Sequence, residues 1–314
     1  MRTPRLVGSA VTVVGVLAVG SVLPVQASAP APRSADATIA VTVPLLVAAA
    51  GPTPRTWQGG LPVRVAPRWW PQGLAKPSAP WSSAWPKPVR FVPTHRGPLS
   101  GRIIALDPGH DIGNSSHLSA INRTYWVGLR KICNTTGTAT NAGYAESSYA
   151  FDVAARLRRL LTAQGATVIL TRDRNSRDTF GPCIGARGTL AAQQGAALMV
   201  AIHADGGPAS GRGFHVIAPA YKAGYTDDIY LGSARLAKAM VTGMVSQRLP
   251  RSTYLSRTIQ VRSDTGAINV SDVPTVTVET LNMRNGTDAR LASSRAGRQQ
   301  VARGLYAGIV RYLR

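Results

Sequence analysis

The stretch IIALDPGHD, Ile103–Asp111, determines how the rest of the chain is interpreted. The residues from Arg102 to Asp107 predict one buried strand, which Pro108-Gly109 ends. His110 therefore follows the carboxyl end of a strand, where α/β proteins bind their ligands. This one segment indicates both a layered α/β fold and a candidate site residue.

C-terminal to this strand, short β-branched runs alternate with amphipathic stretches, which is the pattern of an α/β layer fold. In the helix expected to begin at Glu146, Val153, Leu157 and Leu161 share one apolar face. We therefore predict an α/β fold for residues 101–314, a single three-layer domain with a mixed, mostly parallel central sheet flanked by helices. The other predicted strands are Ala166–Thr171, Ala197–Ile202, Gly213–Ala218 (antiparallel) and Val273–Glu279, and the predicted helices are Glu146–Gln164, Cys183–Gln194, Ile229–Arg248 and Ser294–Leu313.

The chain is strongly basic: its 314 residues include 36 Lys and Arg against 14 Asp and Glu, a net charge of +22. This excess predicts an anionic environment or partner, and by itself it fits nucleic acid, a membrane surface or an anionic cell-wall polymer. With 44% hydrophobic and 16% charged residues, the chain can bury a core and is not a disordered sequence. Only two glutamates occur, Glu146 and Glu279, so each is a candidate for a specific role.

The first 29 residues have the three parts of an export signal: Arg2 and Arg5, an apolar run over Leu6–Val25, and a small-residue site that ends at Ala29. We predict cleavage after Ala29, which makes the protein a secreted one of the cell envelope or extracellular space, without a stable membrane anchor. The alternative is an uncleaved anchor, because the apolar run is just long enough to span a bilayer. Export argues against nucleic acid as the anionic partner.

Residues 30–100 form a Pro/Trp-rich basic linker that we expect to be largely irregular. Its segment 51–100 holds 11 of the 22 prolines and 5 of the 6 tryptophans, and no acidic residue. These tryptophans either stack on sugar rings or a membrane interface, or belong to a tether that packs loosely on the following domain. They are Trp57, Trp69, Trp70, Trp81 and Trp85.

Four side chains that suit zinc chemistry come to one rim of the predicted sheet. His110 and His203 follow strands, Glu279 ends one, and Glu146 lies in the first turn of a helix that can face the same edge. Two imidazoles and one carboxylate are a usual ligand set for catalytic Zn²⁺, which keeps a fourth position for water. A carboxylate that is not a ligand must then accept the proton of the attacking water. Glu279 can fill that role, although spacing alone does not decide which glutamate is the ligand and which the base.

Other readings of these residues stay open on the sequence alone. Glu279 would otherwise form an ion pair with Arg284. Asp107 would either orient His110 as a hydrogen-bond acceptor or cap the Asp-Pro-Gly turn. His117, in a long loop, and His215, inside a predicted strand, are weaker ligand candidates.

The residues quoted so far resemble a known family, the zinc-dependent N-acetylmuramoyl-L-alanine amidases that trim peptidoglycan. The resemblance covers residues 101–314 and none of the linker. It implies that His110, Glu146 and His203 hold one Zn²⁺ per chain and that Glu279 is the catalytic residue. The matching blocks are IIALDPGHD (Ile103–Asp111), AESSYAFDVAARLRRLLTAQGATVILTR (Ala145–Arg172), MVAIHADG (Met199–Gly206) and VPTVTVETLNMRN (Val273–Asn285).

Two features depart from the family. Leu281 stands where members commonly carry glycine, and we expect its side chain to narrow the cleft or reshape the loop. The long segment 111–144 is rich in Gly, Asn and Thr, and we expect a flap or hairpin beside the site. An even pair of cysteines in an exported protein indicates a disulfide, so Cys133 and Cys183 should tie this segment to the loop after the second strand.

Asp107, Arg187 and Asn285 are expected to support the zinc site or bind substrate, with Arg187 on a carboxylate of the stem peptide. The sequence thus predicts a secreted hydrolase that cleaves the amide between the lactyl group of N-acetylmuramic acid and L-alanine. Its substrate is peptidoglycan or muropeptides, and its charge favours binding to anionic cell-wall polymers. The alternatives are a zinc peptidase acting on another stem-peptide bond and a non-catalytic cell-wall-binding protein.

Overall fold

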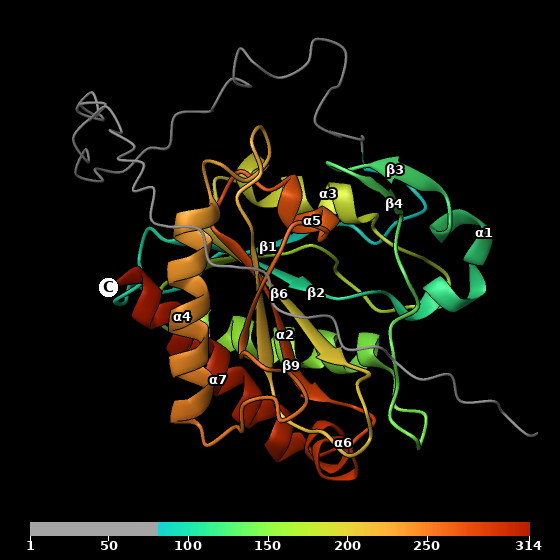
Figure 1. The fold of residues 1–314 in the computed structure, drawn as a ribbon. Coiled ribbons are helices and arrows are strands. Elements are labelled where there is room, and N and C mark those ends of the chain that lie inside the picture. The colour runs from blue at the N-terminus through green and yellow to red at the C-terminus, as the bar shows by residue number, and fades with distance from the viewer. Residues whose placement is uncertain (1–80) are drawn as a thin grey trace, which may run out of the picture. The chain divides into compact units, whose positions relative to one another are not determined.

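The computed structural model describes residues 81–314 (Figure 1). The expected signal peptide, Met1–Ala29, and the linker up to residue 80, with Trp57, Trp69 and Trp70, lie outside the described residues. No helix in the described part is both long and apolar enough to cross a membrane.

Within residues 81–314, a seven-stranded sheet has the order β1-β5-β2-β6-β9-β7-β8. Neighbouring strands are parallel except where β1 meets β5 and where β9 meets β7. The predicted mixed, mostly parallel sheet is therefore confirmed. Its strands are β1 (Val89–Phe91), β2 (Ile103–Pro108), β5 (Thr167–Leu170), β6 (Leu198–Asp205), β7 (His215–Pro219), β8 (Ile259–Arg262) and β9 (Thr275–Asn282).

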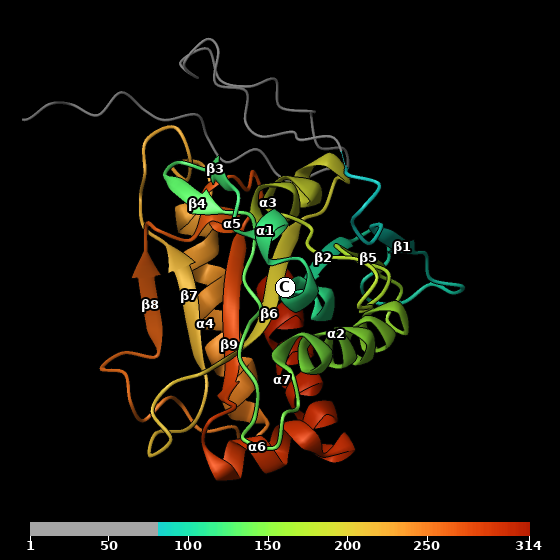
Figure 2. The same cartoon turned by 90° about the vertical axis from the view of Figure 1, so that its right-hand side faces the viewer.

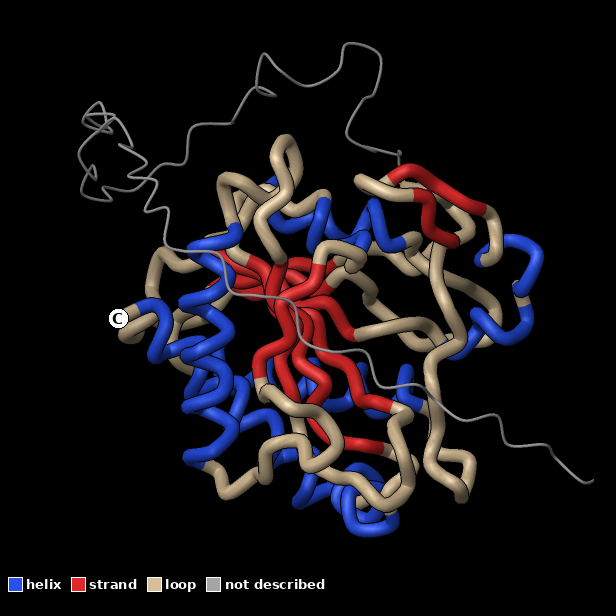
Figure 3. The backbone as a smooth tube through the Cα atoms, viewed as in Figure 1, coloured by secondary structure: helices blue, strands red, loops and turns tan. Residues whose placement is uncertain are grey.

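Helices cover both faces of this sheet, as Figure 3 shows by the strands lying between helices. The main core joins α2, α4 and α7 to one face, and a smaller apolar cluster joins α3 to the other. Short helix α5 packs beside α3 and against β7 and β9. The three-layer arrangement is thus confirmed. The helices are α1 (Leu118–Ile121), α2 (Glu146–Thr162), α3 (Ile184–Gln193), α4 (Tyr230–Ser246), α5 (Gly266–Asn269), α6 (Gly286–Ser293) and α7 (Arg295–Leu313), with a 3₁₀ turn at Ile112–Ser116.

Helix α2 forms where the apolar spacing predicts it. Val153, Leu157 and Leu161 recur every four residues, and all three side chains are buried in the main core. The helix ends just before Gly165, whose φ of +85° lies in the left-handed region that glycine adopts without a steric penalty. Because its apolar face is fixed on the sheet, the first turn of α2 holds Glu146 at a defined place.

Strands β6 and β9 both continue beyond their predicted ends. The sequence predicts that they end at Ile202 and Glu279, whereas they run to Asp205 and Asn282. Their parallel register shifts between His203 and Asp205, so β9 carries one extra residue there. Such a β-bulge reverses the alternation of side chains along β9. Because both strands extend further than predicted, the pair of His203 and Glu279 lies inside the sheet rather than at its end.

The linker joins the domain earlier than expected. Strand β1 lies within it and pairs with β5, and Leu99 is buried in the main core. Trp85 is buried beside the cysteines, with Trp81 packed against it edge to face. Trp81 and Trp85 therefore pack on the domain, which is one of the two roles predicted for the linker tryptophans.

A disulfide links Cys133 to Cys183, with a Cα–Cα distance of 4.3 Å, as predicted. The segment before Cys133 contains a small hairpin, β3 (Thr124–Trp126) and β4 (Arg130–Ile132), which confirms the expected hairpin in residues 111–144. Figure 2 shows the chain leaving β4 and passing in front of β6 and β9 before it enters α2. The cross-link therefore anchors a segment that leads directly to Glu146.

Candidate metal centre and active site

The sheet register aligns three polar side chains on one face. His203 of β6 is opposite Glu279 of β9, and Glu279 is opposite His215 of β7. Because residues two apart on a strand share a face, these side chains lie on the face that carries Met199, which packs against α3. The row therefore lies near the carboxyl ends of the parallel strands, on the face opposite α2, α4 and α7.

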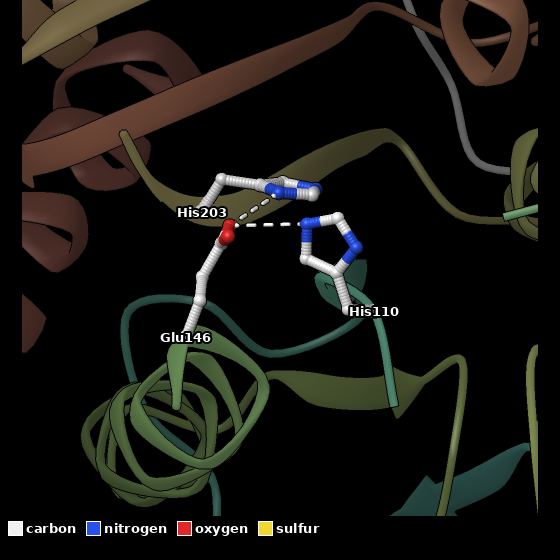
Figure 4. A group of neighbouring side chains, drawn as sticks. All are labelled: His110, Glu146 and His203. Atoms are coloured by element: carbon white, nitrogen blue, oxygen red, sulfur yellow. Dashed lines mark hydrogen bonds and ion pairs between the residues drawn. The ribbon is translucent and has the colours of Figure 1, made fainter. Parts of the chain in front are cut away.

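Three of the expected ligands converge at this edge of the sheet (Figure 4). Nitrogen atoms of His110 and His203 and a carboxylate oxygen of Glu146 all lie within 4.8 Å of one another. Glu146 Oε1 is 3.2 Å from His110 Nε2 and 2.9 Å from His203 Nδ1. Within residues 81–314 no other group of His, Cys, Asp and Glu side chains is close enough to hold a metal ion.

Backbone groups hold the cluster in place. The carbonyl of Thr135 lies 3.0 Å from His110 Nδ1, and because a carbonyl only accepts hydrogen bonds, Nδ1 donates to it and Nε2 is the nitrogen that faces Glu146. The N–H groups of Thr138 and Ala204 donate to the two carboxylate oxygens of Glu146. Such partners fix the orientation of metal ligands.

The backbone around His110 is unusual in a way that serves the cluster. His110 has a φ of +54°, a left-handed conformation that costs energy in a residue with a side chain. The preceding residue must be glycine, because a Cβ on Gly109 would lie 2.4 Å from the ring of His203. This tight turn brings the two imidazole rings to a centroid distance of 4.8 Å.

The electrostatics of the cluster suit a cation. Burial alone would raise the pKa of Glu146, but the two histidines outweigh burial and hold it well below its ordinary value. Burial likewise lowers the pKa of His110, yet the Glu146 carboxylate raises it overall. A buried carboxylate between two imidazoles thus attracts positive charge, and these three donors are a usual set for zinc. The residues present therefore fit a divalent metal.

Glu279 stands beside the cluster without a partner of its own. Its Oε2 atom is buried and accepts no hydrogen bond, and the alternative ion pair with Arg284 is not formed, because the Arg284 guanidinium is directed to the carbonyl of Ala139. Burial and the nearby carboxylates of Glu146 and Asp205 raise the pKa of Glu279 well above its ordinary value. A raised carboxyl pKa is the usual condition of a general acid or base.

Asp107 does not accept a hydrogen bond from His110, which was one of its two predicted roles. Its Oδ1 atom instead accepts hydrogen bonds from Arg187 at 2.6 Å and Thr171 at 2.5 Å. Arg187 is also not at the substrate surface, being 2% exposed, with N–H groups that donate to the carbonyls of Pro108 and His110 as well. Asp107 and Arg187 therefore stabilise the turn that carries His110. The predicted contact of Arg187 with a carboxylate of the stem peptide is wrong, because the side chain is buried.

Asn285 and Leu281 both lie outside the metal cluster. The side chain of Asn285 caps helix α6, accepting from the N–H groups of Thr287 and Asp288. Leu281 is 1% exposed and lies in the main core, because the bulge in β9 directs it away from the face of Glu279. The predicted narrowing of the cleft by Leu281 is therefore wrong.

Arg172, which ends a matching block two residues after β5, was not predicted as a site residue. Its guanidinium is fully buried and donates to the carbonyls of Pro108, Gly109 and Ser147, so it joins the His110 turn to the start of α2. Burial lowers the pKa of Arg172 to about 9. An arginine at the end of an apolar strand was the signal that could have identified it.

The two weaker histidine candidates stay out of the cluster. His117 bonds to the carbonyl of Gly113 and stacks on Phe180. His215 is buried beside Asp205 and Tyr254, and burial lowers its pKa.

Comparison with known proteins agrees with this geometry. A family model described as N-acetylmuramoyl-L-alanine amidase matches residues 104–311. The chain belongs to this amidase family. Membership makes the chain a hydrolase of the N-acetylmuramoyl-L-alanine amide bond in peptidoglycan, with a role in the cell envelope or outside the cell.

Relatives of this amidase include the curated N-acetylmuramoyl-L-alanine amidase Rv3717 of Mycobacterium tuberculosis, which is 34% identical over 68% of this chain and 88% of its own length. The crystal structure of the amidase Ami1 from Mycobacterium smegmatis has 35% identity and a TM-score of 0.64, covering 68% of this chain and 98% of that one. Ami1 from Mycobacterium abscessus gives 34% identity and a TM-score of 0.63, over 69% of this chain and 100% of the other. These matches cover the α/β domain.

Proposed function

We propose that this amidase uses one Zn²⁺ held by His110, Glu146 and His203, with Glu279 as the residue that moves the proton. The observation that carries the proposal is the convergence of three ligand atoms within 4.8 Å, beside a partnerless carboxylate on the adjacent strand. When bound, Zn²⁺ supplies Lewis-acid chemistry that polarises the amide carbonyl and makes water a better nucleophile.

The protein's own groups supply the rest of the reaction. The carbonyl of Thr135 holds the proton of His110 on Nδ1, so that Nε2 faces the cluster. Glu279 Oε2 accepts the proton of the attacking water and later delivers it to the nitrogen of L-alanine as that amine leaves. Because its pKa is raised by burial and by neighbouring carboxylates, the protonated form of Glu279 is accessible between these two steps.

We further propose that the amidase reaches peptidoglycan by export, with cleavage after Ala29. Cleavage removes Arg2 and Arg5, so the net charge falls from +22 to +20, which still favours contact with anionic wall polymers and would keep the enzyme near its substrate.

Digestion of purified muropeptides by the full-length protein tests the reaction. Mass spectrometry should find stem peptides with a free L-alanine amine and sugars with an intact lactyl acid. New ends within the stem peptide would identify a peptidase instead. Binding without any turnover in the presence of Zn²⁺ would identify a wall-binding protein with an inactive site.

Three substitutions test the residue roles. His110→Ala should lose both bound zinc and activity, whereas Glu279→Gln should keep the metal and lose about 10²-fold or more in kcat. His117→Ala is the matched control, because His117 lies on the same segment but outside the cluster, and it should keep both. Full activity of Glu279→Gln, or full zinc in His110→Ala, would contradict the assignment.

A further inference from the structure

Exposed aromatic side chains gather on the β3–β4 hairpin and on the loop after β7. Tyr125 and Trp126 of the hairpin are 38% and 51% exposed, and Tyr221 of the loop is 61% exposed. They belong to the few large hydrophobic side chains that the described domain leaves in solvent. Aromatic rings in this position are typical of a binding surface rather than of a core.

The ring of Trp126 is exposed, yet it is held in one orientation. Its Nε1 atom donates to the hydroxyl of Tyr225 at 2.9 Å, across 99 residues of sequence. The Lys222 ammonium lies 5.2 Å from the centre of the Tyr225 ring and donates to the carbonyl of Gly128 in the hairpin turn. A ring fixed before binding loses little conformational entropy when a ligand stacks on it.

This aromatic surface is continuous with the metal centre along the chain. Hydrogen bonding in the hairpin extends from the Trp126–Arg130 pair to the Cys133 N–H, which donates to the carbonyl of Arg123. At a strand rise of about 3.4 Å per residue, Trp126 lies about 10 Å along the hairpin from that end. Thr135, two residues after Cys133, contacts His110. Figure 2 shows the hairpin on the side of the molecule from which this segment descends toward α2.

The hairpin side of this surface is also positively charged. Arg130 and Lys131 lie on β4, whereas the facing loop carries Lys222 together with Asp227 and Asp228. The chain between Asp111 and Glu146 contains no acidic residue at all. A ligand that combines ring faces with carboxylates would complement both the aromatic rings and this charge.

We propose that Trp126 and Tyr221 form a platform that binds the glycan strand of peptidoglycan, whereas Tyr125, the neighbouring residue on β3, faces the other side of the hairpin. The inference rests on the proposed function, because the cleaved amide joins the stem peptide to a sugar of that strand. With this amide at the metal centre, neighbouring sugars must continue past the site, and the aromatic platform provides faces on which they stack. Each lactyl group freed by the reaction adds a carboxylate that the surrounding cations attract.

Binding to glycan strands stripped of stem peptides tests the platform, because these strands contain no cleavable amide. Wild-type full-length protein should bind them in titration calorimetry, and Trp126→Leu should weaken the affinity roughly tenfold. Trp126→Phe should keep most of the affinity, because the ring remains although the bond to Tyr225 is lost. Tyr221→Ala removes a second ring, whose centre lies 5.3 Å from that of Tyr230 in an edge-to-face contact.

Kinetics separate the platform from the catalytic centre. On polymeric peptidoglycan, Trp126→Leu should raise KM with kcat unchanged, while KM for a muramoyl-peptide monomer should stay the same. Val92→Ala, an exposed side chain that follows the edge strand β1, is the control and should change neither value. Zinc content measured for each variant shows whether the metal centre is intact.

Three results would overturn the platform: no binding of stripped strands by wild type, the same loss in Val92→Ala as in Trp126→Leu, or an equal rise of KM on the monomer. Bound strands without turnover of any substrate would overturn the proposed function and leave the platform standing. If Trp126→Leu and Tyr221→Ala both leave the turnover of polymeric peptidoglycan unchanged, the platform is refuted and the proposed function is not.

Discussion

Replacing Arg187 by methionine should cost both stability and metal affinity. In the structure its guanidinium donates to Asp107 and to the carbonyls of Pro108, His110, Gly181 and Pro182, at 2.6–2.9 Å. Methionine fills similar space but leaves the Asp107 carboxylate buried without its countercharge. Breaking one side of a buried ion pair costs about 3–5 kcal/mol. Loss of the support behind the His110 turn should also weaken zinc binding about 10- to 100-fold.

Denaturant unfolding of the full-length variant, with the metal removed by a chelator, measures the first effect, and zinc titration measures the second. Adding Asp107→Leu to Arg187→Met should recover part of the lost stability, because the double variant buries no unpaired charge. A loss below about 1 kcal/mol for Arg187→Met, or simple additivity in the double variant, would refute the reasoning.

The ion pair of Asp107 and Arg187 also makes the free energy of unfolding depend on pH in the acid range. Burial alone would raise the pKa of Asp107, but Arg187 and Thr171 lower it below the ordinary value of 3.8. The contribution of this carboxylate is therefore fully present above pH 3.8 and is lost as the pH falls through the lowered folded-state pKa. Wild type should lose stability there, and the Asp107→Leu, Arg187→Met variant should lose less.

Gly137→Ala should weaken zinc binding in a zinc titration, because the added Cβ would lie 2.8 Å from a carboxylate oxygen of Glu146. Gly143→Ala is the control, because Gly143 also has a positive φ but no atom lies within 4 Å of the added Cβ. This control should cost about 1–2 kcal/mol of stability and leave zinc binding unchanged. Leu281→Ala should lower the free energy of unfolding by about 2–5 kcal/mol with KM unchanged, and an altered KM would contradict its place in the core. Replacing Cys133 and Cys183 by serine opens a loop with a sequence separation of 50 and should cost about 4 kcal/mol in the same unfolding assay.

The elements and the metal cluster could be predicted because their signals are local. Apolar runs and helical spacing mark β2, β5, β6 and α2, and residue type marks His110, Glu146 and His203 as possible ligands. Strands β1 and β8 were missed because three or four residues at a sheet edge carry no clear periodicity.

The surroundings of the cluster could not be predicted, because they depend on tertiary contacts. The acceptor behind His110 is a backbone carbonyl, that of Thr135, which any residue type would offer. The role of Arg187 depends on a turn 77 residues away in the chain. The bulge in β9, which sends Leu281 into the core, leaves no trace in a period-two pattern.

The disulfide has a consequence for the order in which the enzyme matures. Two and five residues after Cys133, Thr135 and Thr138 contact the side chains of His110 and Glu146. Before the disulfide forms, the segment that carries Thr135 and Thr138 is not cross-linked to the domain. Zinc binding should therefore improve once the two thiols are oxidised. A wall-degrading enzyme assembled in this sequence would gain its full activity only after leaving a reducing compartment.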